Sequence, residues 1–357
     1  AAADVVDVAG RLIVPGFVDV HCHGGAGAEF AEFARIDRQR AVLDAIAWHR
    51  AHGSTTLLAS LVSRSIAELV NQVAALAELV ESGELAGIHL EGPFISPARC
   101  GAHDPSALRV PDADSIAALL RAGRGAVRMV TLAPELPGAV DAVRQFVDAG
   151  VIVAIGHTDA TEQQVRPAVD AGATVATHLF NGMRPLHHRE PGPVGALLDD
   201  ERVSVELICD LVHLAPTIVR LVARHAGPAR TVLVTDAMAA SGMPDGEYDL
   251  GALRVTVRDG EPRLADGSLA GSTLTMDAAL RNAVTAGLSI TDAVTAAATR
   301  PASLLGGVSG GVLGDVLRGE SSANAGVLAV GKSADLLVLS HDLRLERVMR
   351  HGDWLAN

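Results

Sequence analysis

Cysteine and aromatic residues are scarce in this chain of 357 residues. Cys22, Cys100 and Cys209 are odd in number and widely spaced, which argues against a disulfide framework and favours a reduced, cytoplasmic protein. Aromatic residues make up 3% of a composition that is 49% hydrophobic, so the core must be built mainly from Ala, Val and Leu. The sequence also lacks an apolar run that would span a membrane, and no signal-peptide pattern opens it.

Positive charge is scarce as well. The chain has 42 Asp and Glu against 29 Lys and Arg, a net charge of −13. This balance disfavours nucleic acid and anionic membranes as partners, and any anion site must be local. Lys332 is the only lysine and is remote in sequence from the histidines discussed below. A carbamylated lysine therefore cannot bridge two metal ions among those histidines, and any bridging ligand must be a carboxylate.

Eight apolar segments, rich in β-branched residues, recur along the chain with helix-like segments between them. The apolar segments are residues 14–20, 54–61, 85–90, 126–132, 151–155, 173–177, 203–208 and 231–235. Helical periodicity is clear in residues 66–81 and 115–122. The alternation predicts parallel βαβ units, and near-continuous hydrophobicity predicts strands that are buried on both faces. Eight such units in about 250 residues predict an α/β fold, the (β/α)₈ TIM barrel.

Two parts of the chain fall outside this barrel. Residues 248–269, with Asp259-Gly260 near their middle, predict a β-hairpin inserted after the eighth strand. Residues 326–357 contain strand-like runs that we expect to combine with residues 1–14 in a small β domain, leaving residues 15–325 as the catalytic barrel. The Gly/Ser-rich stretch 305–325 is the expected flexible join.

Potential metal ligands stand at the ends of the apolar segments. His21 and His23 follow the first segment, and their spacing points both imidazoles to one face of a strand. Glu91 and His178 directly follow the third and sixth segments, and His157 follows the fifth after Gly156. Because active sites of TIM barrels lie at the C-terminal ends of the strands, we expect these five side chains to converge on one or two divalent ions. Imidazole and carboxylate ligands without clustered cysteine favour Zn²⁺ or another borderline ion.

Asp236 follows the eighth segment and has two interpretations. It is either the N-cap of a helix, or a general base that takes a proton from water and passes it to a leaving group. The metal-ligand pattern favours the second. Cys22 alternates with the two histidines beside it, so its side chain is expected to pack on the opposite face. The remaining histidines that we interpret as ordinary hydrogen-bonded polar residues are His49, His52, His225, His341 and His351.

Six motifs in a fixed order carry a resemblance to a known family. They are residues 15–25 (PGFVDVHCHGG), 89–94 (HLEGPF), 156–160 (GHTDA), 177–183 (THLFNGM), 234–237 (VTDA) and 269–276 (LAGSTLTM). Together they resemble the N-acetylglucosamine-6-phosphate deacetylases of the amidohydrolase superfamily. The resemblance extends from Pro15 to Asp335. It implies a metal-dependent, cytoplasmic homodimer that hydrolyses the acetamide of N-acetyl-D-glucosamine 6-phosphate to D-glucosamine 6-phosphate and acetate, in amino-sugar catabolism and cell-wall recycling.

The resemblance also implies roles for single residues. Glu91, His157 and His178 match the principal metal ligands of the family, whereas the histidine pair at 21 and 23 matches ligands of a second ion that only some members bind. Asp236 matches the catalytic acid/base, and His103 matches a residue of a mobile loop that reaches the acetamide.

The substrate-binding positions implied by the resemblance lie on later loops. His213 matches a residue that binds the sugar, and Arg189 matches one that binds the phosphate, often across a homodimer interface. The other matching positions are Asn181 and Gly182, which contact the substrate, and Leu269 and Ala270, which line the wall near the acetyl group.

Two alternatives remain open. One is an amidohydrolase that acts on a different N-acetyl sugar or on a cyclic amide, although the lack of a strand lysine counts against cyclic amidases with a carbamate bridge. The other is a non-catalytic barrel kept as an assembly protein. Such a protein has no need to retain metal ligands together with a general base.

Overall fold

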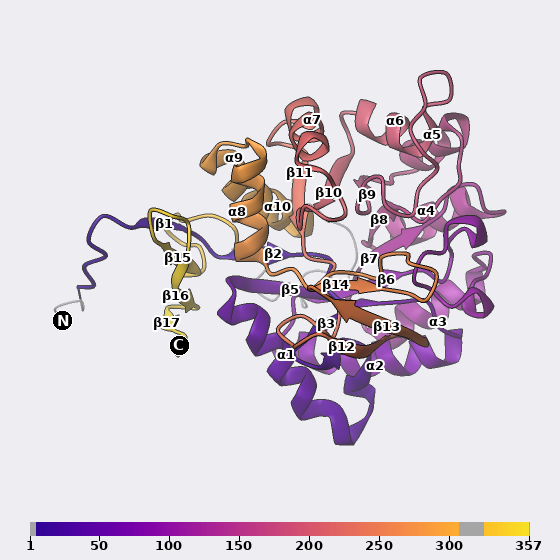
Figure 1. Cartoon of the computed structure of the whole chain (residues 1–357). Coiled ribbons are helices and arrows are strands. Elements are labelled where there is room, and N and C mark those ends of the chain that lie inside the picture. The colour runs from indigo at the N-terminus through magenta and orange to yellow at the C-terminus, as the bar shows by residue number, and fades with distance from the viewer. Residues whose placement is uncertain (1–4, 307–324, 357) are drawn as a thin grey trace.

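The computed structural model describes residues 5–306 and 325–356, and its centre is an eight-stranded parallel barrel (Figure 1). The neighbouring strands in order are β11 (Thr231–Val234), β10 (Ser204–Ile208), β9 (Val175–Ala176), β8 (Ile152–Ile155), β7 (Val127–Leu132), β6 (Gly87–Glu91), β5 (Ser54–Leu61) and β2 (Phe17–Asp19). All eight lie within the apolar segments of the sequence or extend them by one residue, and the predicted TIM barrel is confirmed.

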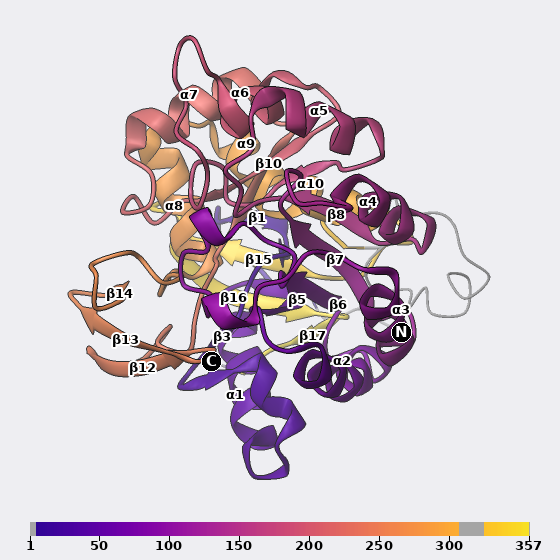
Figure 2. The ribbon, with the colours of Figure 1, turned by 90° about the vertical axis from the view of Figure 1, so that its right-hand side faces the viewer.

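Helices surround the barrel (Figures 1 and 2). They are α1 (Gln39–Ala51), α2 (Ile66–Glu81), α3 (Ala113–Gly123), α4 (Ala139–Asp148), α5 (Glu162–Asp170), α6 (Gly192–Asp199), α7 (Pro216–Ala226), α8 (Met276–Ala286), α9 (Ile290–Val294) and α10 (Arg300–Gly306). Helix α2 illustrates why they form. Ser65 and Glu68 make a capping box at its start, and the apolar positions Leu69, Val73 and Leu76 are fully buried on one face. No helix in the part of the chain described here is long and apolar enough to cross a membrane.

Short elements complete the chain between the main strands and helices. They are the hairpin β3 (Gly24–Gly25) and β4 (Ala28–Glu29), the 3₁₀ turns η1 (Phe30–Ala34), η2 (Ile36–Arg38), η3 (Pro97–Arg99) and η4 (Pro105–Ala107), and the π-helical segment η5 (Thr295–Thr299).

The barrel closes between its first and last strands without a regular ladder. Among the described residues, β2 and β11 are not paired in the sheet, but Asp19 spans the seam between them. The hydroxyl of Thr235 donates to Asp19 Oδ2 at 2.6 Å, and beyond the strands the N–H of His23 donates to the carbonyl of Ala237 at 2.8 Å. A buried side chain and loop backbone therefore hold the ends of the sheet together next to the predicted site.

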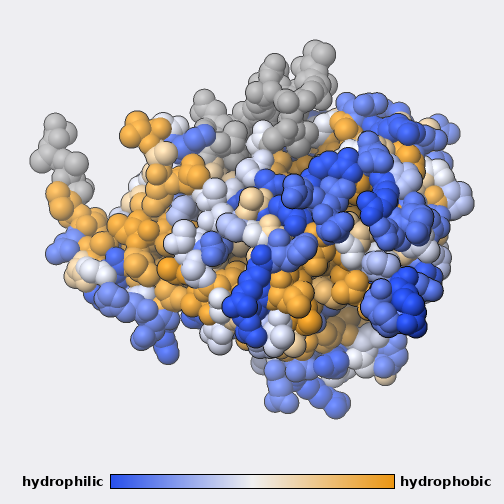
Figure 3. All heavy atoms as spheres, turned by 90° about the horizontal axis from the view of Figure 1, so that it is seen from above, coloured by the Kyte–Doolittle hydropathy of each residue, from blue (hydrophilic) through white to orange (hydrophobic). Residues whose placement is uncertain are grey.

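A four-stranded antiparallel sheet joins the two ends of the chain. Its strands, in order, are β1 (Leu12–Pro15), β15 (Leu336–Leu339), β16 (Leu345–Arg350) and β17 (Asp353–Trp354). Apolar side chains gather over this end of the molecule (Figure 3), where Val5, Val6 and Ile13 are exposed. The extent of a separate β domain stays a prediction, and most of the Gly/Ser-rich stretch 305–325 lies outside the described residues.

The prediction of one continuous strand over residues 14–20 was wrong at Gly16. The chain leaves the terminal sheet at Pro15 and enters the barrel at Phe17. The backbone at Gly16 lies against Thr55, and a Cβ atom there would stand 2.2 Å from Thr55 Oγ1. A glycine is needed at this crossing, and it separates two strands that the apolar pattern joins.

The insertion after β11 is a three-stranded antiparallel sheet of β12 (Gly246–Leu250), β13 (Leu253–Arg258) and β14 (Glu261–Arg263) (Figure 2). The expected hairpin is β13 and β14, and β12 adds a strand before it. Val255 and Val257 are buried against Val62 and Met238 from loops that follow barrel strands. The insertion thus packs on the same end of the barrel as the predicted site.

Candidate active site

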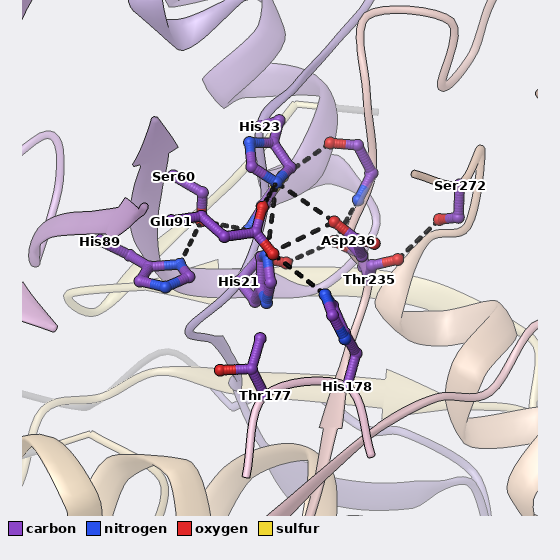
Figure 4. Close-up of polar contacts among 12 residues, drawn as sticks. His21, His23, Ser60, His89, Glu91, Thr177, His178, Thr235, Asp236 and Ser272 are labelled. Atoms are coloured by element: carbon purple, nitrogen blue, oxygen red, sulfur yellow. Dashed lines mark hydrogen bonds and ion pairs between the residues drawn. The ribbon is translucent and has the colours of Figure 1, made fainter. Parts of the chain in front are cut away.

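The strand-end residues meet at one end of the barrel, and Figure 4 shows most of them. The buried residues of this cluster are His21, His23, Glu91, His157, His178 and Asp236. His157, His178 and Asp236 each lie two residues beyond the end of β8, β9 or β11, and they have positive φ values of 45°, 25° and 50°. Such backbone conformations are uncommon and strained for residues with a Cβ, and they are often found at active sites. Here they occur where the chain leaves each strand and the side chain faces the cluster.

A first group of donor atoms is formed by Glu91, His157 and His178. Glu91 Oε1 lies 3.1 Å from His157 Nε2 and 3.0 Å from His178 Nε2, and these two nitrogens are 3.2 Å apart. His157 Nδ1 lies 2.9 Å from the carbonyl oxygen of Arg99, which can only accept a hydrogen bond. The proton of neutral His157 is therefore on Nδ1, and the lone pair of Nε2 faces the group.

A second group shares the same glutamate and contains His21, His23 and Asp236. His23 Nε2 lies 3.1 Å from Glu91 Oε2 and 3.2 Å from Asp236 Oδ1. His21 Nε2 lies 3.5 Å from Glu91 Oε1 and 3.4 Å from Asp236 Oδ1. The Glu91 carboxylate thus contacts imidazoles of both groups: Oε1 lies near His21 as well as the first group, and Oε2 lies near His23.

The electrostatics of the cluster favour positive charge. Burial raises the pKa of the Glu91 carboxyl, but His21 and the other surrounding imidazoles outweigh burial and hold it well below its usual range. Burial likewise raises the pKa of the Asp236 carboxyl, but His21 and His23 outweigh burial, and the pKa is lowered. Burial lowers the pKa of His23, yet hydrogen bonds to the two carboxylates raise it to about 9. A divalent cation would neutralise the two buried carboxylates without protonation of the imidazoles. The nitrogen and oxygen donors of the cluster fit such an ion.

Residues 12–313 match the model of the amidohydrolase family. The chain belongs to this family.

Named relatives agree with that assignment. The chain is 38% identical over 290 residues to N-acetylglucosamine-6-phosphate deacetylase of Lysinibacillus sphaericus, covering 78% of this chain and 72% of the relative. It is 41% identical over 279 residues to N-acetylgalactosamine-6-phosphate deacetylase of Escherichia coli O157:H7, covering 77% and 72%. A solved structure of a mutant N-acetyl-D-glucosamine-6-phosphate deacetylase from Mycobacterium smegmatis, in complex with N-acetyl-D-glucosamine 6-phosphate, is 49% identical with a TM-score of 0.90, covering 99% of this chain and 90% of that one.

His103 of this amidohydrolase lies between η3 and η4, on the loop after β6, and its Nε2 is 3.4 Å from Glu91 Oε2. Its Nδ1 accepts a hydrogen bond from the backbone N–H of Ser63 at 3.1 Å. Since a backbone amide only donates, the proton of the neutral ring must be on Nε2, which faces the cluster. Burial is the main cause that lowers the pKa of His103 to about 4, so the ring is neutral at pH 7. His103 therefore offers one N–H donor to the site.

A cavity of about 470 Å³ opens over the cluster. The substrate-binding residues predicted from the sequence that line it are His103, Asn181, Gly182, His213 and Leu269. Gly182 has a φ of +61°, and a Cβ atom there would lie 2.8 Å from His157 Nδ1, so a larger residue would displace that ring. Asp210 Oδ2 lies 2.6 Å from His213 Nδ1 and orients that ring.

Two predicted substrate residues lie elsewhere in the amidohydrolase chain. Ala270 is fully buried and packs in the apolar cluster beneath the insertion, next to Leu269. Arg189 is not among the described residues that line the cavity. It is exposed on the loop between β9 and α6, with its Nη1 2.7 Å from His188 Nε2. Within one chain, therefore, Arg189 does not contribute to the cavity wall.

Sequence reasoning missed two charged residues at the site of this amidohydrolase. Arg263, on β14, lines the cavity, and its guanidinium makes an exposed pair with Glu261. Glu206, on β10, is fully buried beneath the cluster. The available signal for Glu206 was a single charge inside the apolar segment 203–208. For Arg263 the sequence held no comparable signal, because its position depends on how the insertion folds back.

Proposed function

We propose that this amidohydrolase hydrolyses the acetamide of N-acetyl-D-glucosamine 6-phosphate to D-glucosamine 6-phosphate and acetate, in amino-sugar metabolism. The observation that carries the proposal is the shared Glu91 between two donor groups, with Asp236 and His103 beside it at the base of a cavity. The substrate is proposed from the sugar phosphate bound by the relative that is 49% identical. The three free cysteines support a cytoplasmic location.

Glu91, His157 and His178 would hold one divalent cation, and His21, His23, Asp236 and the shared Glu91 would hold a second. Zn²⁺ is the first candidate because the donors are imidazole nitrogens and carboxylate oxygens. When bound, such a cation polarises the amide carbonyl and lowers the pKa of water so that a nucleophile forms near neutral pH.

Asp236 supplies the proton transfers. Its pKa is held below the ordinary value, so the carboxylate is ionised at neutral pH and accepts the proton of the attacking water. It then donates that proton to the sugar nitrogen as the C–N bond breaks, since an amine leaves far more readily when it is protonated. The carboxylate lies at the floor of the cavity, 3.2 Å from His23 Nε2.

His103 stabilises the carbonyl oxygen as it gains negative charge. Its neutral ring carries the proton on Nε2, which faces the cavity, and Ser63 holds this tautomer before substrate arrives. A donor that is already oriented toward developing charge stabilises a transition state without reorganisation.

The sugar phosphate would occupy the cavity between the cluster and the insertion. Leu269 and the ring of His213 line this space, together with Asn181 and Gly182. We propose that the protein is a homodimer and that Arg189 of one subunit binds the phosphate of the substrate held in the other. A guanidinium binds phosphate through two hydrogen bonds, and Arg189 is exposed on the loop between β9 and α6.

The galactosamine relative, 41% identical, makes the C4 epimer the competing substrate. Acetate release should be measured with N-acetylglucosamine 6-phosphate, N-acetylgalactosamine 6-phosphate and unphosphorylated N-acetylglucosamine, using protein whose metal content is known. We expect the first to have the highest kcat/KM. If only N-acetylgalactosamine 6-phosphate is hydrolysed, that sugar is the substrate. If metal-loaded protein releases acetate from none of the three sugars, the proposal of deacetylation is wrong.

A further inference from the structure

Glu206 is a buried glutamate on β10 that touches two of the strand-end residues. A single oxygen, Oε2, lies 3.2 Å from His21 Nδ1 and 3.2 Å from the backbone nitrogen of His178. The carboxylate thus joins the turn after β9 to the histidine after β2, across the interior of the barrel. The side chain of Glu206 is completely shielded from solvent.

The contact with His21 determines which of its nitrogens faces the cluster. Glu206 Oε2 accepts a hydrogen bond from the backbone N–H of His178, and His21 Nδ1 faces the same acceptor oxygen, so Nδ1 carries the ring proton. The lone pair of Nε2 then points toward Glu91 and Asp236, at 3.5 and 3.4 Å. Carboxylates that hold a ligating imidazole in this way fix its orientation and increase its basicity.

The other oxygen of Glu206 has no hydrogen-bond partner within the described residues, although it is buried. A buried carboxylate oxygen without a partner is unfavourable unless positive charge lies close by. The ring of His21 is adjacent, with its Nδ1 3.2 Å from Glu206 Oε2. A stability argument alone would favour an apolar residue at this position, because Val205 and Leu207 on either side of Glu206 in β10 are apolar and fully buried.

We infer that Glu206 is a positioning residue that retains the second cation, the one held by His21, His23 and Asp236. It does so by fixing His21 as an Nε2 donor and by adding a negative charge behind that ring. This inference rests on the metal-dependent function proposed above. The first group, in which His157 is oriented by the carbonyl of Arg99, depends on Glu206 only through one backbone contact.

The test is a titration of metal-free protein with Zn²⁺ in competition with a chromophoric chelator, for the wild type, Glu206→Gln and Glu206→Asp. We expect two binding events in the wild type. Glu206→Gln removes the charge at constant shape and should weaken one event by about 10–100-fold while leaving the other within about threefold. Glu206→Asp keeps the charge but shortens the reach to His21, and it should show the same selective loss if the Gln variant does not fold.

The matched control is Asp277→Asn, which removes a buried charge between α1 and α8 and should leave both affinities unchanged. Equal weakening of both events, or no change in either, would overturn the positioning role of Glu206. Wild-type protein that binds one ion with an affinity unaffected by Glu206→Gln would overturn it while leaving deacetylation intact. Wild-type protein that binds no ion would overturn both proposals.

Discussion

The backbone N–H of Asp236 donates a hydrogen bond to the carbonyl oxygen of His21 at 2.8 Å, across the seam of the barrel. A backbone hydrogen bond therefore fixes the proposed acid/base, Asp236, relative to a proposed metal ligand, His21. Their relative position does not depend on the Asp236 carboxylate, so that group can be altered without moving the backbone that carries it.

Asp236→Asn should lower kcat by about a hundredfold or more, because the amide has the same shape but cannot carry a proton. KM for N-acetylglucosamine 6-phosphate should change by less than about threefold. Steady-state kinetics with measured metal content check this, with the exposed Asp44→Asn as the matched control. A kcat near that of the wild type would make Asp236 a helix cap or a metal ligand only.

His103→Ala should lower kcat by about a hundredfold, the usual effect of removing one donor to a developing oxyanion. Ser63→Ala should have a much smaller effect, since the backbone N–H that fixes the His103 tautomer is retained at 3.1 Å. Kinetics of the two variants decide the point. Equal losses would mean that the Ser63 hydroxyl, 2.9 Å from Nδ1, is what holds the ring.

Arg189→Ala should raise KM for the phosphorylated sugar, and it should reduce the difference in kcat/KM between that sugar and unphosphorylated N-acetylglucosamine. A lost charge-assisted contact costs about 1.5–3 kcal/mol, or roughly tenfold to a hundredfold in kcat/KM. Arg144→Ala, exposed on α4, is the control. If Arg263→Ala reduces the difference in kcat/KM between the two sugars and Arg189→Ala does not, the phosphate is bound by Arg263 of the same chain, on the insertion.

Asp277→Asn should destabilise the fold by about 1–3 kcal/mol at pH 7, because a buried carboxylate loses its hydrogen bonds. Burial raises the pKa of Asp277, but His52, Thr275 and Arg281 outweigh burial and lower it. A lowered folded-state pKa gives stability that is present above the unfolded value of about 3.9 and is lost as pH falls toward the folded value. Denaturant unfolding at several pH values should show the gap between wild type and variant constant above about pH 5 and shrinking below pH 4. A gap that grows in acid would contradict this sign.

Removal of metal should abolish acetate release and lower the melting temperature. The buried cluster contains two carboxylates that a cation would neutralise, and a ligand present at 100 times its Kd stabilises the folded state by about 2.7 kcal/mol. Thermal melts before and after chelation, and again after stoichiometric Zn²⁺ is returned, provide the measurement. Identical melts in all three states would argue against cation binding at the cluster.

The barrel could be predicted because its strands are buried on both faces and are therefore apolar throughout. The strand-end residues could be selected because each ends an apolar run, as Glu91 does at the end of β6. The structure brings all six together, whereas their individual roles stay predictions that the variants above test.

Other features could not be predicted because they depend on contacts between distant segments. The break at Gly16 follows from the close approach of Thr55, and periodicity carries no information about such a neighbour. Glu206 looks like an anomaly in its strand until its carboxylate is seen to contact His21, which follows β2, and the backbone nitrogen of His178, which follows β9. Arg263 reaches the cavity only because β12 to β14 fold back over the barrel.

The terminal sheet has a consequence for the order in which parts of the chain can fold during synthesis. Leu12–Pro15 are synthesised more than 300 residues before Leu336–Leu339, their partner in the sheet. Likewise β2 meets the β11 side of the seam only after the residues around Thr235 have left the ribosome. Pairings so far apart in sequence close late and slowly. The two donor groups share Glu91, and the second of them is completed only with Asp236. A nascent chain therefore contains all residues of the first donor group well before it contains the residue proposed to transfer the proton.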